Sequence, residues 1–154
     1  MGQNPKGDRL MATYRYVQCS FWADPFILGL TPEEKYFYLY LITNPHTKQC
    51  GIYELPHKLI ELETGYNAET VQKLLNRFRD YDKVSYSTET YEVFIHNWLR
   101  FNRSDSPKVL QCIIKELNQV KNSDFQEKVM QQLKGYGYSI NTLSKDYASP
   151  IAKK

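Results

Sequence analysis

Residues 51–82 read GIYELPHKLIELETGYNAETVQKLLNRFRDYD, and this stretch decides the fold. Its first four residues alternate small and apolar side chains, a pattern typical of a short strand. Pro56 suits the first position of a following helix. Gly65 is the residue expected where a helix ends in a left-handed backbone conformation, and Asn67 is a good N-cap for the next helix. The stretch therefore predicts a strand followed by two helices across a tight turn.

The second of these helices is expected to be amphipathic. Its apolar residues recur at i, i+3, i+4 and i+7, which places on one face Val71, Leu74, Leu75 and Phe78. The other face is polar and carries Glu69, Gln72, Lys73, Asn76, Arg77, Arg79 and Asp80. We therefore expect the apolar face to join the core and the polar face to point to solvent.

The residues after the second helix complete a recognisable plan. Residues 83–86 and 91–95 have the composition of strands, and residues 87–90 form a polar turn between them. A strand, a helix-turn-helix and a hairpin wing make up a winged-helix domain. Two amphipathic helices joined by a glycine turn also occur in all-α proteins that bind no DNA. The hairpin makes the pattern more restrictive, and we predict a mainly α fold with a small β-hairpin: a winged helix-turn-helix plus C-terminal helices.

Sequence patterns further along the chain indicate its organisation. Thr31, Pro32 and Glu34 together predict a capped helix that runs to about Thr43. Two C-terminal helices each carry one narrow apolar stripe, with Leu110, Ile113, Ile114 and Leu117 in the first and Phe125, Val129 and Leu133 in the second. Such helices cannot bury enough area alone, so we expect them to pack on the winged helix, with the helix from 32 to 43 as the contact surface.

These patterns divide the chain into four predicted parts. They are a disordered N-terminal extension (1–13), a winged-helix domain (14–103), a helical appendage packed on it (104–136) and a flexible linker or tail (137–154). Residues 14–19 alternate and fit either a strand or an arm. The arm would lead into the apolar residues Phe21, Trp22, Phe26, Ile27 and Leu28, which either fold over the core or form an oligomer contact.

Composition and charge limit the function classes. The chain has 154 residues with 42% hydrophobic and 24% charged residues, as in ordinary soluble globular proteins. It has neither a run of ~20 apolar residues nor a signal-peptide core at its N-terminus, so we predict a cytoplasmic protein without a membrane partner. The net charge is +2 over residues 1–15 and +3 over residues 134–154, and the middle carries 13 positive against 15 negative residues. A slightly acidic middle predicts weak duplex binding by that part alone.

Catalytic and metal-binding patterns are missing from the sequence. Three widely spaced cysteines argue against both a disulfide framework and a zinc site. His46, Cys50 and His57 do not have the spacing of metal ligands. The chain also has neither a G-x-x-x-x-G-K-[ST] phosphate loop nor a nucleophile elbow. We predict no metal, no cofactor and no enzymatic activity.

Four segments together carry a family resemblance: GIYELPHKLIELETGYNAETVQKLLNRF, FIHNWLRFN, the helix start SPKV and the tail GYGYSINTLSKDYASP. Over residues 11–150 the chain resembles the N-terminal part of phage replication-initiation (replisome organiser) proteins, relatives of the DnaD-type primosomal proteins of Gram-positive bacteria. The resemblance implies a winged helix that self-associates and binds origin DNA. It also implies a later region that engages single-stranded DNA or the helicase-loading machinery. The chain ends where the linker to that region is expected, as in a fragment or a naturally short member.

Together these observations predict a DNA-binding protein that initiates phage-type DNA replication. Its expected partners are double-stranded DNA, further copies of itself, and a helicase loader or primosomal proteins. The alternatives are a non-catalytic assembly module, whose winged helix binds protein, and a transcriptional regulator. The predicted DNA-binding residues lie on the second helix, in the wing and in the connector after it: Asn67, Gln72, Lys73, Asn76, Arg77 and Arg79; Tyr86, Ser87 and Thr88; and Arg100 and Arg103.

Overall fold

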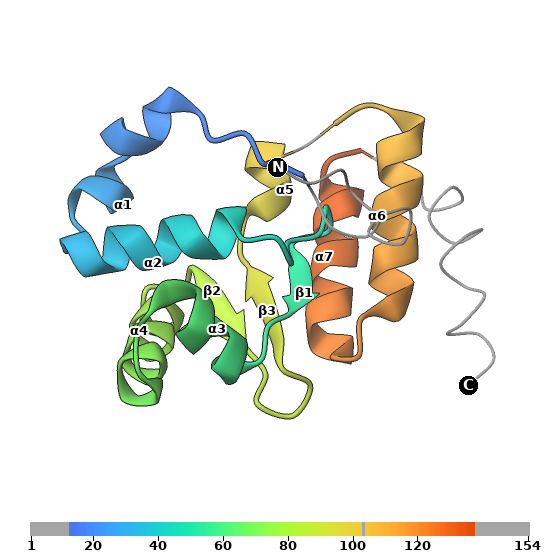
Figure 1. Ribbon diagram of the computed structural model, residues 1–154. Helices are drawn as coiled ribbons and strands as arrows, with labels where there is room; N and C mark the ends of the chain where they lie inside the picture. Colours follow the sequence, from blue (N-terminus) through green and yellow to red (C-terminus); the bar gives the residue numbers. More distant parts are fainter. Residues whose placement is uncertain (1–12, 103, 138–154) are drawn as a thin grey trace.

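The computed structural model describes residues 13–102 and 104–137, which are mainly helical with a small three-stranded antiparallel sheet (Figure 1). In chain order the elements are η1 (Cys19–Ala23), α1 (Pro25–Leu28), α2 (Pro32–Thr43), β1 (Ile52–Glu54), α3 (His57–Thr64), α4 (Ala68–Asp80), β2 (Val84–Tyr86), β3 (Glu92–Ile95), α5 (Trp98–Asn102), α6 (Pro107–Gln119) and α7 (Ser123–Gly135). The predicted order of strand, two helices and hairpin is therefore present between residues 52 and 95.

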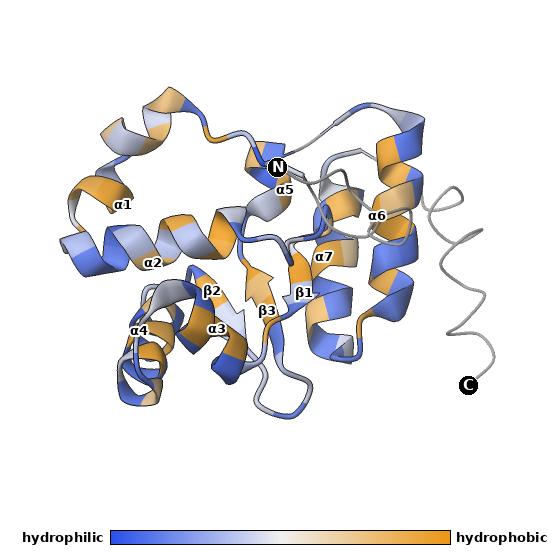
Figure 2. Cartoon of the chain, in the orientation of Figure 1, coloured by the Kyte–Doolittle hydropathy of each residue, from blue (hydrophilic) through white to orange (hydrophobic). Residues whose placement is uncertain are grey.

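The sheet has the strand order β1–β3–β2. The predicted hairpin pairs β2 with β3, with Tyr86 opposite Val93, and β1 joins the other edge of β3, with Tyr53 opposite the same valine. All four residues of β3 are buried. Figure 2 shows hydrophobic residues on the strands and on parts of the surrounding helices. A central strand that is buried on both faces can carry helices on both sides.

One face of the sheet carries α2, α3 and α4. The predicted capping box at the start of α2 is confirmed, because the Thr31 hydroxyl accepts from the Glu34 amide (3.2 Å) and the Glu34 carboxylate accepts from the Thr31 amide (2.9 Å). Phe37 and Leu41 of α2 are fully buried. The Phe37 ring lies 6.1 Å from the ring of Phe78 in α4. These contacts join the first long helix to the helix-turn-helix.

The C-terminal helices α6 and α7 pack on the sheet. The Phe125 ring of α7 lies 5.5 Å from the Phe94 ring of β3. The buried Glu92 carboxylate of β3 accepts hydrogen bonds from the backbone amides of Lys121 (2.9 Å) and Asn122 (2.8 Å), which lie between the two helices. The sequence analysis predicted that α6 and α7 pack on the helix at residues 32–43. The contacts above show that they pack on β3. Val93, Phe94 and Ile95 of β3 are apolar and buried, so the sheet offers an apolar surface for the two helices to cover.

The N-terminal segment and the connector also differ from the simplest prediction. Residues 13–18 form neither a helix nor a strand, so of the two alternatives the arm is present. The short helices η1 and α1 follow it, and the predicted connector contains helix α5. Apart from Thr13 and Gly137, the predicted extension (1–13) and tail (137–154) lie outside the described residues.

Candidate nucleic-acid interface

The turn between α3 and α4 has the geometry that the sequence predicts. Gly65 ends α3 with φ 85°, and its amide donates to the Glu61 carbonyl (2.9 Å). The Asn67 side chain then caps α4 by accepting from the Thr70 amide (2.9 Å). The Asn67 oxygen is therefore engaged within the chain, and its amide nitrogen is the atom left to face a ligand. The turn fixes the direction in which α4 leaves α3.

The inner face of α4 packs against the hydrophobic core and α2. The four predicted core residues are buried: Val71, Leu74, Leu75 and Phe78. The Phe78 ring stacks on Tyr38 of α2, with ring centroids 5.3 Å apart. Directly after α4, the Tyr81 hydroxyl donates to the Glu34 carboxylate (2.5 Å). Burial acts to raise the pKa of Glu34, but the hydrogen bonds from Tyr81 and Thr31 outweigh it and lower that pKa.

The outer face of α4 presents four of the eleven predicted DNA-binding residues to solvent. Gln72, Lys73, Arg77 and Arg79 are exposed, and the Gln72 amide donates to the Asn76 side chain (3.0 Å). Lys73 pairs with Glu69 (3.0 Å), and Arg79 pairs with Asp80 (3.2 Å). All four side chains of these two pairs are more than 60% exposed. Ion pairs of this kind are weak, so a phosphate can compete for either cation.

The hairpin brings the predicted wing residues into three different environments. The Tyr86 hydroxyl donates to the Leu55 carbonyl (2.9 Å), and burial raises the pKa of Tyr86 to about 12. The Ser87 hydroxyl accepts from the Thr90 amide (3.2 Å). Thr88 is exposed at the tip. Tyr86 therefore stabilises the hairpin internally, and the tip residues are the ones placed to meet a ligand.

Of the two predicted connector arginines, Arg100 does not extend this surface. Arg100 is exposed on α5, where its guanidinium lies 5.7 Å from the centre of the Phe101 ring. Figure 1 shows α5 at the opposite end of β3 from the hairpin loop. Arg103 lies outside the described residues. The candidate interface consequently comprises the outer face of α4 and the hairpin tip.

A hydrogen-bonded chain at the base of the hairpin has the residue types of a catalytic triad. The Ser85 hydroxyl lies 2.7 Å from His96 Nε2, and His96 Nδ1 lies 3.3 Å from the Asp82 carboxylate and 3.0 Å from the Asp82 carbonyl. In a catalytic triad the aspartate is buried and fixes the imidazole, whereas the Asp82 side chain is 93% exposed. We therefore infer that these three residues have a structural role, in which their hydrogen bonds hold the α4–β2 turn to the end of β3.

No family model, curated protein or solved structure matches this chain. Within residues 13–102 and 104–137, no cluster of three or more His, Cys, Asp or Glu side chains is arranged to hold a metal ion. No helix in the same part of the chain is long and apolar enough to span a membrane. Functional assignment therefore rests on the geometry and on the sequence resemblance.

A second feature, which the sequence analysis did not predict, is a groove between the N-terminal arm and α5. We call it the arm groove, and its lining includes Tyr16, Gln18, Phe21, Phe26, Tyr38, Lys83, Trp98, Phe101 and Asn102. These residues come from the arm, η1, α1, α2, the turn before β2 and α5. One signal in the sequence was available: aromatic residues crowd both residues 14–26 and residues 98–101. Periodicity within each segment could not show that the two segments meet.

Proposed function

We propose that this chain is a winged-helix DNA-binding protein that acts in the initiation of phage-type DNA replication. The observation that carries the proposal is the element order α2–β1–α3–α4–β2–β3 with the strand order β1–β3–β2. This arrangement leaves one polar helix face exposed beside a hairpin. The resemblance to replication-initiation proteins supports the assignment to replication, in the cytoplasm of a phage-infected cell.

In this function α4 is the recognition helix and enters the major groove. Recognition helices contact base edges from their exposed N-terminal side. The Gln72–Asn76 pair supplies amides, which suit adenine, and Arg77 suits guanine or a phosphate. Lys73 binds phosphate once it leaves Glu69. Thr88 at the hairpin tip adds a hydroxyl for the sugar-phosphate backbone.

A single copy binds DNA weakly in this scheme, and assembly supplies the missing affinity. The middle of the chain is slightly acidic, and Glu89 lies at the exposed hairpin tip. Copies that associate present several recognition helices at once, which raises the overall affinity without any new DNA contact. The residues proposed for this self-association are Phe21, Trp22, Phe26, Ile27 and Leu28, of which Trp22 and Leu28 are exposed.

The second candidate is an assembly module that uses the same face to bind protein. Lys73 and Arg79 already have carboxylate partners on α4. A face of matched charges fits a protein partner as well as it fits a phosphate backbone. The two candidates differ in one measurable property, because only DNA binding releases counterions from DNA.

The test is a salt series of duplex binding with the double variant Lys73→Ala/Arg77→Ala. The matched control is Lys108→Ala/Lys115→Ala, which removes two exposed cations from α6. The α4 variant should weaken binding and reduce the slope of log affinity against log salt by about one unit per lost contact, and the α6 control should keep both values. Duplex binding that is unchanged in a folded α4 variant would reject DNA recognition by α4 and favour the assembly module.

A further inference from the structure

The N-terminal arm is fastened to the rest of the protein by the side chain of Arg15. This residue is half-buried, whereas residues 13, 14 and 16–20 are exposed. The Arg15 guanidinium donates through Nε to the Thr47 hydroxyl (2.8 Å) and through Nη2 to the Thr47 carbonyl (2.9 Å). Among the described residues, no backbone group forms a hydrogen bond with the backbone of residues 14–17. The position of this part of the arm therefore depends on Arg15.

The groups that receive Arg15 are buried and fixed in place. Thr47 is 1% exposed, and its hydroxyl also donates to the Asn44 carbonyl (3.0 Å). The guanidinium carbon lies 5.6 Å from the centre of the Trp98 ring, and this indole is itself held by its bond to the Gln49 carbonyl (3.1 Å). A planar guanidinium can make two directed hydrogen bonds and also interact with the face of a ring. The contacts thus suit an arginine better than a lysine.

The bound position of Arg15 is a balance between opposing effects. Burial lowers the pKa of Arg15, because it removes the charge from water, and the Glu116 carboxylate of α6 opposes this effect. The same carboxylate accepts from the Cys50 amide (2.9 Å). The hydrogen bonds to Thr47 and the attraction of Glu116 must offset the desolvation of the guanidinium. Loss of one of these partners should therefore favour a position in which the guanidinium returns to water.

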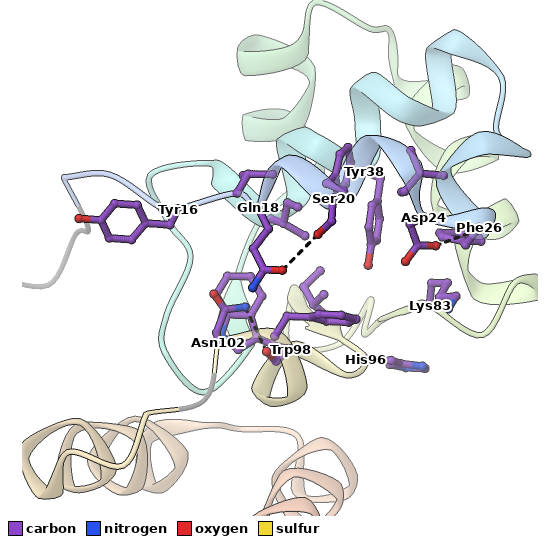
Figure 3. A pocket seen from close by; sticks show the side chains of 16 residues that line it. Tyr16, Gln18, Ser20, Asp24, Phe26, Tyr38, Lys83, His96, Trp98 and Asn102 are labelled. Atoms are coloured by element: carbon purple, nitrogen blue, oxygen red, sulfur yellow. Dashed lines mark hydrogen bonds between the residues drawn. The ribbon is translucent and has the colours of Figure 1, made fainter.

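The chain that follows Arg15 runs over a cavity. The arm groove has a volume of about 150 Å³ and lies between the arm and residues of α2 and α5. Figure 3 shows Gln18 facing Trp98 and Asn102 across the groove, whereas Tyr16 points away from it. Protein interiors are otherwise close-packed, with few voids larger than a water molecule. This span of the arm therefore gains little support from the surface below it.

The arm meets the body again at η1. The Phe21 ring stacks on the Tyr38 ring of α2, with centroids 6.4 Å apart and an angle of 8° between the planes. The Phe21 amide donates to the Gln18 carbonyl (2.9 Å). The chain between Arg15 and Phe21 thus has one fastening at each end and a cavity beneath its middle.

We propose that the arm is a strap locked by Arg15, which opens about η1 without unfolding the body and uncovers Trp98 and the apolar walls of the arm groove. Local opening of this kind occurs in segments with few buried apolar contacts and few protected hydrogen bonds. The closed strap covers Trp98, which is 3% exposed, and the open strap also uncovers Ile42 and Ile95 in the groove. The strap therefore controls access to this apolar surface. Figure 1 shows the arm at the opposite end of β3 from the hairpin loop, so the device is separate from duplex binding by α4.

Trypsin tests this proposal, because it cleaves after arginine and its specificity pocket must receive the guanidinium. Arg15 cannot enter that pocket while it donates to Thr47, so the rate of cleavage between Arg15 and Tyr16 should follow the open fraction. Thr47→Val removes the hydroxyl acceptor and leaves the cleavage site unchanged. It should speed cleavage about tenfold, as expected for the loss of one hydrogen bond from a charged group. Thr47→Ser keeps the hydroxyl and is the matched control, which should be cut as slowly as the unaltered chain.

A second pair of variants tests the charge of Glu116. Glu116→Gln keeps an acceptor for the Cys50 amide and loses the negative charge, so it should speed cleavage after Arg15 by about threefold. Glu127→Gln removes the same charge from an exposed position of α7 and should leave the rate unchanged. Cleavage after Lys35, within α2, reports unfolding of the body and should be equally slow in every variant.

The exposure of Trp98 is measured separately. In a Trp22→Phe background Trp98 is the remaining tryptophan, so acrylamide quenching of fluorescence reports its access to solvent. Thr47→Val should increase this quenching, and Thr47→Ser should not. The proposal would be overturned by a Thr47→Val variant that is cut after Arg15 no faster than the unaltered chain. Equal acceleration of cleavage after Arg15 and Lys35, or equal protection of Trp98 in the two Thr47 variants, would overturn it as well.

Discussion

Replacing Gly51 with alanine tests how tightly the sheet is built against α5. Gly51 has φ +82°, and an added Cβ would lie 2.6 Å from Trp98 Cβ and 2.8 Å from Trp98 Cγ. The indole cannot easily move away, because it is buried and its Nε1 donates to the Gln49 carbonyl (3.1 Å). The backbone is fixed as well, since the Gly51 carbonyl accepts from the Ile95 amide (2.9 Å).

The expected loss of stability has two parts. A left-handed backbone costs a residue with a Cβ about 1–2 kcal/mol, and forcing extra volume into a packed core costs about 1–3 kcal/mol. The free energy of unfolding of the Gly51→Ala variant should therefore fall by about 2–5 kcal/mol. Gly65 is the matched control, because its φ is +85° but an added Cβ would meet nothing within 4 Å. Gly65→Ala should lose only the backbone part, about 1–2 kcal/mol.

Urea denaturation followed by circular dichroism measures both variants. With a denaturant slope of about 2 kcal/mol/M, the midpoint should fall by about 1–2.5 M for Gly51→Ala and by about 0.5–1 M for Gly65→Ala. The slope should stay the same, so that the midpoints report stability. If the two variants lost the same stability, the contact between the Gly51 backbone and Trp98 would not be as close as the structure has it.

The remaining predictions concern four other positions. Trp22→Ser should shift a concentration-dependent sedimentation profile towards the monomer, because Trp22 is 55% exposed in η1; a profile that stays the same would exclude this residue from self-association. Glu89→Lys should tighten duplex binding at low salt if the hairpin tip approaches phosphate, and an unchanged affinity would leave the tip in solvent. Glu92→Ala should lower the free energy of unfolding by about 1–3 kcal/mol, because it leaves two backbone amides at the α6–α7 turn without their acceptor; equal stability would show that water replaces the carboxylate there. Glu34→Gln should be less stable than the unaltered chain at neutral pH and should lose less stability in acid. The folded pKa of Glu34 lies below its ordinary value of 4.5, so its contribution is present above that value and disappears as the pH falls through the lowered pKa; parallel losses for the two proteins in acid would contradict this assignment.

Features set by neighbouring residues could be predicted from the sequence. The capping box at Thr31 and Glu34 depends on residues three apart, and the left-handed end at Gly65 depends on one residue. The buried face of α4 follows from spacing alone. Each of these is local, so the pattern that encodes it is contiguous in the chain.

Features that depend on distant contacts could not be predicted. Residues 52–54 suggest a strand, but only the fold shows that it pairs with β3. The sequence likewise suggests that Tyr86 is a phosphate ligand, because a tyrosine in a wing carries a hydroxyl. The carbonyl of Leu55 takes that hydroxyl, and nothing in the spacing of 31 residues between them indicates this. Arg100 is predicted to bind DNA from the connector after the wing, but it lies on α5, because β3 carries the chain away from the hairpin loop.

In the proposed function, the positively charged terminal segments and the fixed helix α4 have different roles. The chain's excess of positive charge lies in residues 1–15 and 134–154, whereas the described middle holds the shaped surfaces. Phosphate attraction depends on charge and carries no sequence information. Recognition needs side chains fixed in position, and α4 is fixed by the stacking of Phe78 on Tyr38 and by the bond from Tyr81 to Glu34. In the proposed function the terminal segments therefore add to the salt dependence that Lys73 and Arg77 give, and α4 sets the discrimination between sequences.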